Sequence, residues 1–386
     1  MASLNKRRKM KGSLRTLEAK KLLLKHKRVI CTAIEELNAD ALLLFCFLRI
    51  INCNGAFPVC FSDAWCKTLR SIEDPEEKNQ QIALFSDLFE ISLIQMLLED
   101  SDKVDDTVIS DGRLTAVKRL IDFMDEIDAV QKIVEDQEKL TDEPMKESEW
   151  AAILGNHVLK KLAVSREMVI DISYPERHIR CPCGCKNQIT IGDCSFGNRS
   201  VWHGSVDILI GRVAVATTKE TAEDDFDDEI YTSAFEDSRN QIVAEAIAFS
   251  FTLNKGLVPT IAISKETFKI FMYHPEHDLL FEGSELKFYV KQPLLPRKQK
   301  KLDTRSIFAL WLAINYDFFC SGVSQDHKDF GYTADFKSHV KDSIKIYKES
   351  MNFGNCRHGK SSELPYKAVK GKWRRCHSSA AADASD

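Results

Sequence analysis

The residues most able to do chemistry lie between positions 202 and 219, where two short apolar runs each carry one charged residue. Asp207 stands at the start of the first run, and Lys219 closes the second after a tight Gly211-Arg212 connection. Every second side chain of a strand points to the same face, so an antiparallel pair would bring Lys219 towards Asp207. A carboxylate and an ammonium group held close together are typical of a site for a divalent metal and a phosphate.

A second group of possible metal ligands is the run Cys181-Pro182-Cys183-Gly184-Cys185, followed by Cys194. Four thiolate or imidazole groups could surround a structural Zn²⁺, and His178 and His203 stand nearby in the sequence. A usual zinc knuckle has about two residues between paired cysteines, whereas one residue separates each pair here. Three alternatives follow: a zinc site formed by Cys181, Cys183, Cys185 and Cys194, a hairpin tip with unbound thiols, or a redox disulfide.

The elements around Asp207 and Lys219 alternate between helix and strand patterns. Helical spacing of apolar residues predicts one helix over 147–162, before the pair, and another over 238–253, after it. Strand patterns follow at 258–264, 268–274 and 279–281. The predicted order is therefore helix, strands, helix, strands.

This order, with Asp207 and Lys219 at strand ends, resembles the PD-(D/E)XK nuclease superfamily over roughly residues 146 to 290. The family's signature is an Asp that opens one core strand and an acid two positions before a Lys at the end of the next. The resemblance implies an α/β (α+β) fold of the restriction-endonuclease type, a mixed sheet flanked by helices. It also implies Mg²⁺-dependent hydrolysis of phosphodiester bonds in DNA.

The resemblance assigns roles to individual residues. Asp207 matches the metal-binding Asp and Lys219 matches the Lys that steadies the attacking water, while Thr217 stands where the family has an acid. A neutral hydroxyl is a poor ligand for Mg²⁺, so a second acid has to come from elsewhere. The candidates are Glu245 on the second helix, as a further Mg²⁺ ligand, and Glu149 on the first. An active nuclease and an inactive descendant both remain open.

The charges of this chain are gathered in blocks, although the formal net charge is only -4. Basic runs occupy 6–28, 297–301 and 367–375, and acidic runs occupy 99–106, 122–149 and 220–229. Local basic patches permit contact with nucleic acid, and a solvated surface is the alternative for each run. We predict nucleic-acid contacts from Gln241, Lys298, Lys300 and Lys301. The first basic run could also be a nuclear import signal.

The patterns divide the 386 residues into five segments. We predict a disordered basic tail (1–12), a helical region (13–140), the nuclease-like core (145–292), a C-terminal helical cap (303–351) and a disordered tail (352–386). Within the helical region, apolar residues recur at helical spacing over 17–24, 29–51, 76–98 and 114–139. In the cap, helices are predicted over 304–319 and 336–351.

Composition narrows the class of protein. A hydrophobic share of 44% and a charged share of 29% are typical of soluble globular proteins, and no apolar run reaches a membrane span of roughly 20 residues. The N-terminus lacks the features of a secretory signal, so we expect an intracellular protein, nuclear or cytoplasmic, with its 12 cysteines as thiols or metal ligands. The rivals to a nuclease are a noncatalytic protein that binds nucleic acid, or a protein partner through its helical region, and a zinc-stabilised binding module.

Overall fold

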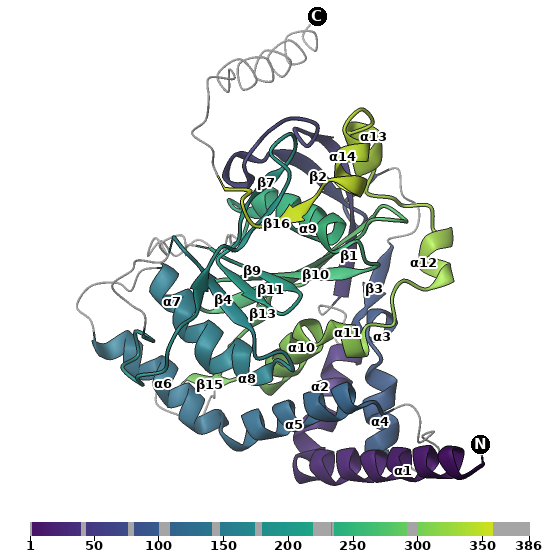
Figure 1. Cartoon of the computed structure of the whole chain (residues 1–386), viewed down its shortest axis with the longest axis vertical. Coiled ribbons are helices and arrows are strands. Elements are labelled where there is room, and N and C mark those ends of the chain that lie inside the picture. Colours follow the sequence, from purple (N-terminus) through teal and green to yellow (C-terminus); the bar gives the residue numbers. More distant parts are fainter. Residues whose placement is uncertain are drawn as a thin grey trace, which may run out of the picture.

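The computed structural model of the chain describes residues 2–39, 44–75, 81–99, 109–140, 147–173, 180–218, 233, 235–291 and 300–357. These residues form a large mixed β-sheet with helices on both of its faces (Figure 1). The predicted α/β (α+β) class, a mixed sheet flanked by helices, is confirmed.

The main sheet has the strand order β2-β1-β12-β11-β10-β9-β8-β4-β5, with β3 paired to β1 and β13 paired to β11. Its neighbouring strands are antiparallel except for β9 with β10 and β4 with β5. The strands are β1 (Leu44–Cys53), β2 (Cys66–Arg70), β3 (Ile82–Leu84), β4 (Met168–Asp171), β5 (Ile191–Gly192), β8 (Ile208–Ile210), β9 (Val213–Thr217), β10 (Val258–Ile263), β11 (Thr267–His274), β12 (Leu279–Gly283) and β13 (Leu286–Lys287).

The segment 147–263 has the predicted order of elements. α7 (Glu147–Leu154), a π-turn (Gly155–Leu159) and α8 (Lys160–Leu162) form one continuous helix, which is followed by the antiparallel strands β4, β8 and β9. Parallel pairing of β9 with β10 requires the chain to return across the sheet, and α9 (Arg239–Leu253) makes that return. α9 ends at Asn254, whose left-handed φ of 47° is typical of a helix C-terminus.

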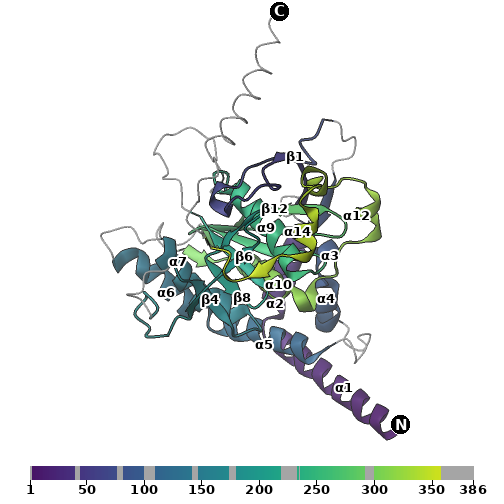
Figure 2. The same ribbon diagram turned by 45° about the horizontal axis from the view of Figure 1, so that its top comes forward.

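The other face of the sheet is covered by α10 (Thr304–Ile314) and α2 (Lys27–Ala39), which pack against each other (Figures 1 and 2). α10 begins at Asp303, whose side chain accepts the N–H of Arg305 at 3.1 Å. Because both faces are covered, every residue of β10 is buried. The apolar strand pattern at 258–264 is therefore that of a fully buried strand.

The remaining elements surround these layers, and none of the described helices combines the length and apolar character that a membrane crossing requires. Two small sheets join β6 (Ser195–Gly197) to β7 (His203–Ser205) and β16 (Asn352–Phe353), and β14 (Tyr289–Lys291) to β15 (Lys300–Leu302). The other helices are α1 (Ala2–Lys25), the short 3-10 helix η1 (Phe61–Asp63), α3 (Phe85–Leu88), α4 (Ile91–Glu99), α5 (Asp111–Asp125), α6 (Ile127–Leu140), α11 (Tyr316–Phe319), α12 (Gln325–Asp329), α13 (Phe336–His339) and α14 (Ile344–Glu349).

The prediction of a helix over 29–51 is wrong for its second half, because α2 ends at Ala39 and β1 begins at Leu44. A continuous apolar run fits a buried strand as well as a buried helix, so periodicity could not separate them. Through β1, which pairs with β12, the N-terminal segment belongs to the main sheet and is not a purely helical region. The predicted helix over 336–351 is likewise interrupted, into α13 and α14.

Residues 2–12, for which the sequence predicts a disordered tail, belong to α1, which begins at Ala2. α1 packs against α5, where Arg15 pairs with Asp111 and Lys118 with Glu18 at 2.7 Å. Part of the first basic run is thus neutralised within the chain. The predicted C-terminal tail begins with ordered residues up to Arg357, while 358–386 and the predicted boundary at 141–144 lie outside the described residues.

A buried carboxylate ties the N-terminal strands to the rest of the sheet. Glu282 on β12 is 3% exposed and accepts hydrogen bonds from Arg70 at 2.9 and 3.1 Å, from Arg239 at 2.6 Å and from Lys269 at 3.3 Å. Burial raises its pKa, but the Arg70 hydrogen bonds and the neighbouring positive charges outweigh burial and lower the pKa to about 2. Glu282 therefore joins β2, β11 and α9 while remaining ionised.

We predict that Glu282→Gln lowers the free energy of unfolding by about 3–5 kcal/mol at neutral pH, because the buried Lys269 and the partly buried Arg70 and Arg239 lose their shared carboxylate. The lowered pKa means that the charge of Glu282 stabilises the fold above its unfolded pKa and that this contribution is lost as the pH falls towards about 2. The difference between wild type and variant should thus shrink in acid. Urea unfolding at pH 7 and pH 3 measures it, with the exposed Glu73→Gln as control; equal losses in the two variants would contradict the prediction.

Candidate functional site

Asp207 lies at the end of the sheet where three strands meet. Its Oδ2 accepts the backbone N–H of Thr217 at 2.7 Å. This hydrogen bond lies just beyond the last paired residues of β8 and β9, Ile208 and Val215. Its backbone carbonyl accepts the N–H of Asp171, the last residue of β4, at 2.9 Å. The carboxylate thus accepts an N–H that a backbone carbonyl would accept in a regular strand pair. The side chain and the backbone of Asp207 are both held in this way at the strand ends.

Glu245 supplies a second acid from α9. It is fully buried, Gln241 donates to its Oε1 at 2.8 Å, and its Oε2 has no hydrogen-bond partner among the residues that the structure describes. Burial raises the pKa of Glu245, the Gln241 hydrogen bond lowers it and the charge of Asp207 raises it again, to about 8. A buried carboxylate oxygen without a donor, near a second carboxylate, is an arrangement that a divalent cation would stabilise.

Gln241 thus contacts Glu245, and Asp207 is close enough for its charge to raise the pKa of Glu245, while a metal site shared by the two acids stays a prediction. Glu149 lies half-buried on α7, which contacts β9. Lys219 lies outside the described residues, so its pairing with Asp207 stays a prediction. The acidic run 220–229 lies outside them as well.

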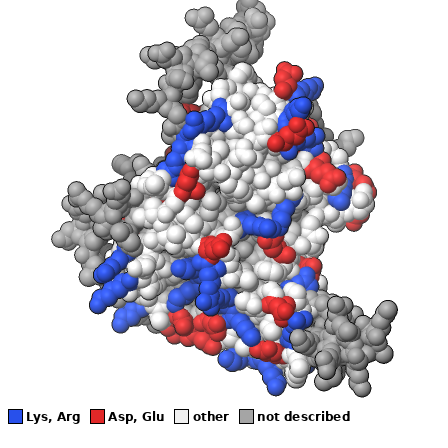
Figure 3. All heavy atoms as spheres, viewed as in Figure 1, with Lys and Arg blue, Asp and Glu red and all other residues white. Residues whose placement is uncertain are grey.

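The predicted nucleic-acid contacts of the second basic run are only partly described. Lys298 lies outside the described residues, and Lys300 and Lys301 belong to β15, where Lys301 is exposed. On the face shown in Figure 3, Lys and Arg side chains lie among Asp and Glu side chains. Some of the positive and negative side chains form direct ion pairs, such as Lys161 with Glu126 at 2.6 Å.

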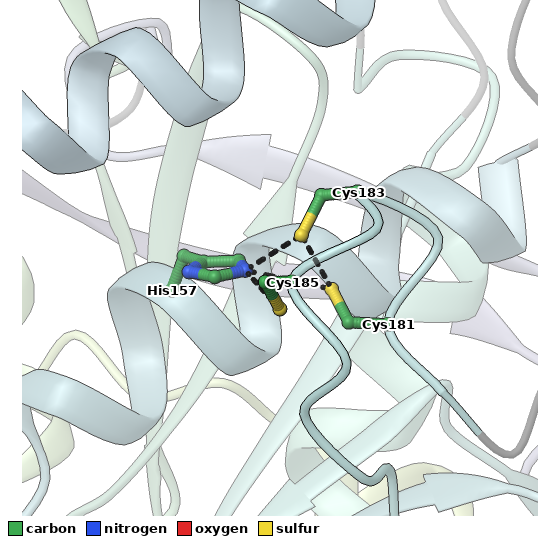
Figure 4. Close-up of side chains that lie close together, drawn as sticks. All are labelled: His157, Cys181, Cys183 and Cys185. Atoms are coloured by element: carbon green, nitrogen blue, oxygen red, sulfur yellow. Dashed lines mark hydrogen bonds between the residues drawn. The ribbon is translucent and has the colours of Figure 1, made fainter.

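The metal-ligand cluster consists of His157, Cys181, Cys183 and Cys185, whose ligand atoms all lie within 4.8 Å of one another (Figure 4). His157 comes from the π-turn, where Lys160 donates its N–H to the carbonyl of Gly155, five residues earlier. A side chain at Gly155 would meet Met168 at 3.0 Å and Ile208 at 3.2 Å, so glycine lets this turn lie close against β4 and β8.

The three cysteines lie at the tip of a short hairpin closed by the pairing of Arg180 with Gln188. Gly184, with a φ of +78°, makes the tip reverse so that the sulfur atoms on either side turn towards His157. Burial, and next to it the positive charge of Lys161, lowers the pKa of His157 and keeps the imidazole neutral, the form that binds a metal. The cluster could hold a metal ion such as zinc.

The predicted zinc set is wrong in one ligand. Cys194 is fully buried elsewhere, where its Sγ contacts the carbonyl of Val169 at 3.4 Å, and His157 takes its place. Sequence reasoning missed His157 because it precedes the cysteines by more than twenty positions. The available signal was the polar pair Asn156-His157 inside the otherwise apolar stretch 150–159. Two other histidines lie near the cysteines in the sequence. His203 contacts Cys60 at 3.5 Å, and His178 lies outside the described residues.

Comparisons of the chain with models of known protein families, with curated proteins and with solved structures found no significant match. The function therefore has to be argued from the geometry of the site itself.

We predict that Glu245→Gln makes the fold more stable in alkaline solution, by on the order of 3–5 kcal/mol near pH 9. An acid whose pKa is raised in the folded state loses stability as the pH rises from its unfolded value, about 4.3, through about 8. The glutamine cannot ionise, so the variant escapes this loss. Urea unfolding between pH 5 and pH 9, without divalent cations, measures it; parallel pH profiles of the two proteins would refute the raised pKa.

Proposed function

We propose that this chain is a PD-(D/E)XK nuclease-like protein that hydrolyses phosphodiester bonds of DNA with Mg²⁺ bound by Asp207 and Glu245. The observation that carries the proposal is the buried Oε2 of Glu245, which lacks a hydrogen-bond donor among the described residues and lies near the carboxylate of Asp207. Two such oxygens fit a hard cation, since Mg²⁺ prefers carboxylate ligands.

The order of elements supports the proposal. A helix over 147–162 precedes three antiparallel strands, β4, β8 and β9, and α9 then crosses to the parallel strand β10. The resemblance implies this arrangement, with the metal-binding Asp at the start of the middle strand. Asp207 directly precedes β8, the middle strand of the three.

Each residue of the site would have its own role in hydrolysis. Asp207 is held for metal binding by the N–H of Thr217, and Gln241 orients Glu245, whose proton would leave when a cation binds. When bound, Mg²⁺ would polarise the scissile phosphate and lower the pKa of a water molecule. Glu149 would assist from α7, and Lys219 would orient the attacking water.

A noncatalytic role is the second candidate, and Thr217 favours it. Thr217 stands in the position of the motif acid, and its backbone N–H already occupies an oxygen of Asp207. In this case the scaffold would bind nucleic acid through Gln241, Lys298, Lys300 and Lys301, or a protein partner through its N-terminal helices. For either role we place the protein inside the cell, in the nucleus or cytoplasm. Thiols stay reduced there, so the cysteines of the metal-ligand cluster would keep a structural Zn²⁺.

The proposal predicts that purified protein cleaves labelled single- or double-stranded DNA with Mg²⁺ or Mn²⁺. Asp207→Asn and Glu245→Gln should each lower the rate by on the order of 100-fold or more, because each removes a metal ligand. Asp326→Asn changes an exposed acid of α12 and should leave the rate unchanged. Equal cleavage by wild type and Asp207→Asn would exclude this site.

Metal binding distinguishes the two candidate functions. Mg²⁺ should remove the alkaline loss of stability of the wild type, because a bound cation pairs with the ionised Glu245, and it should not do so in Asp207→Asn. Mg²⁺-dependent stabilisation without cleavage would favour the noncatalytic role. The absence of both effects would refute the metal site as well as the hydrolysis.

A further inference from the structure

The sulfur atoms of the metal-ligand cluster converge on a single nitrogen atom. Nε2 of His157 lies 3.0 Å from the Sγ of Cys183, 3.4 Å from that of Cys185 and 3.5 Å from that of Cys181. One ring nitrogen carries either one N–H or one lone pair, so it cannot form a good hydrogen bond to three thiols at once. Four ligand atoms arranged in this way surround a common point.

The distances fit one tetrahedral ion. With bonds of about 2.3 Å to sulfur and about 2.0 Å to nitrogen, the ligands of tetrahedral zinc lie about 3.8 Å apart for two sulfurs and about 3.5 Å apart for sulfur and nitrogen. The sulfur–nitrogen distances of 3.0–3.5 Å and the 3.2 Å between the sulfurs of Cys181 and Cys183 are equal to these values or shorter by up to about 0.6 Å, so small outward shifts of the side chains would admit the ion. The 3.2 Å is far longer than a disulfide bond of about 2.05 Å.

The hairpin that carries the cysteines has little else to hold it. Among residues 180–189, only Cys181 and Ile189 are buried, and most of the others are exposed. A two-stranded hairpin without an apolar face is at best marginally stable. Besides the buried Ile189, the cluster connects the hairpin to the body of the protein, because His157 belongs to the π-turn that packs against Met168 and Ile208.

We infer that His157, Cys181, Cys183 and Cys185 bind one Zn²⁺ as a closed structural site, which fastens the hairpin 180–188 to the π-turn of the first core helix. Three thiolates and an imidazole form a soft ligand set that selects zinc over Mg²⁺ or Ca²⁺. All four coordination positions are filled by side chains, which is typical of structural rather than catalytic zinc. The side-chain amide of Asn156, 3.9 Å from the Sγ of Cys185, can donate to that sulfur from outside the ligand set. This inference deepens the zinc assignment of the proposed function and is independent of hydrolysis at Asp207.

Zinc content of the full-length protein tests the inference. Protein purified without chelators should contain one zinc per chain by native mass spectrometry, and Cys183→Ser and His157→Ala should lose it. Cys194→Ser is the matched control, because the structure places Cys194 outside the ligand set, and it should keep its zinc. Wild-type protein that contains no zinc and takes up none in a titration would overturn the site. Loss of zinc from a folded Cys194→Ser protein, with retention in His157→Ala, would also overturn it.

Two further measurements keep the test decisive if the variants fold poorly. Wild-type protein loaded with Co²⁺ should show the absorption of a tetrahedral ion and a thiolate charge-transfer band; an octahedral spectrum would contradict the ligand set. Zinc removal by a chelator should expose the hairpin to trypsin at Arg180 and Lys186, both of which are exposed, while the Asp207→Asn protein should keep its zinc and its resistance. Equal digestion with and without zinc would refute the fastening role.

Discussion

The parallel pairing of β9 with β10 is the constraint on which the rest of the candidate active site depends. Two parallel neighbours cannot be joined by a tight turn, so the chain has to cross the sheet between them. α9 makes this crossing and packs directly on the strands, which buries Glu245 fully, beside Gln241 and near Asp207. The raised pKa of Glu245 is thus a consequence of topology, since any acid at this point of the crossover helix would lose its contact with water.

At three places in the fold, burial replaces the water around ionisable side chains by protein groups. The effect on the charge of those side chains differs from place to place. Glu282 is nearly as buried as Glu245, but three cations surround it, so it remains ionised. Glu245 has one amide donor and a negative neighbour, so its charge is disfavoured. The thiols of the metal-ligand cluster have mainly one another and a neutral imidazole. At the last two of these places a bound cation would satisfy buried oxygen or sulfur atoms.

Much of the core could be predicted from the sequence, because its elements carry strong local signals. The helix 147–162, the strands around Asp207 and the crossover helix agree with the structure to within a few residues. The errors have physical causes. The run that begins at Leu44 is almost continuously apolar, and such a run fits a buried strand or a buried helix equally well. Proximity in the sequence favours Cys194 as a ligand, whereas the packing of the π-turn against β4 brings His157 to the cysteines.

The position of β1 has a consequence for how this chain is made. Leu48 pairs with Leu280, so β1 is translated more than 200 residues before its partner strand β12. Until then the edge of β1 that faces β12 is unpaired, and the first five residues of β1 are four aromatic or aliphatic residues and one cysteine. Long-range pairing of this kind slows folding and exposes intermediates to aggregation.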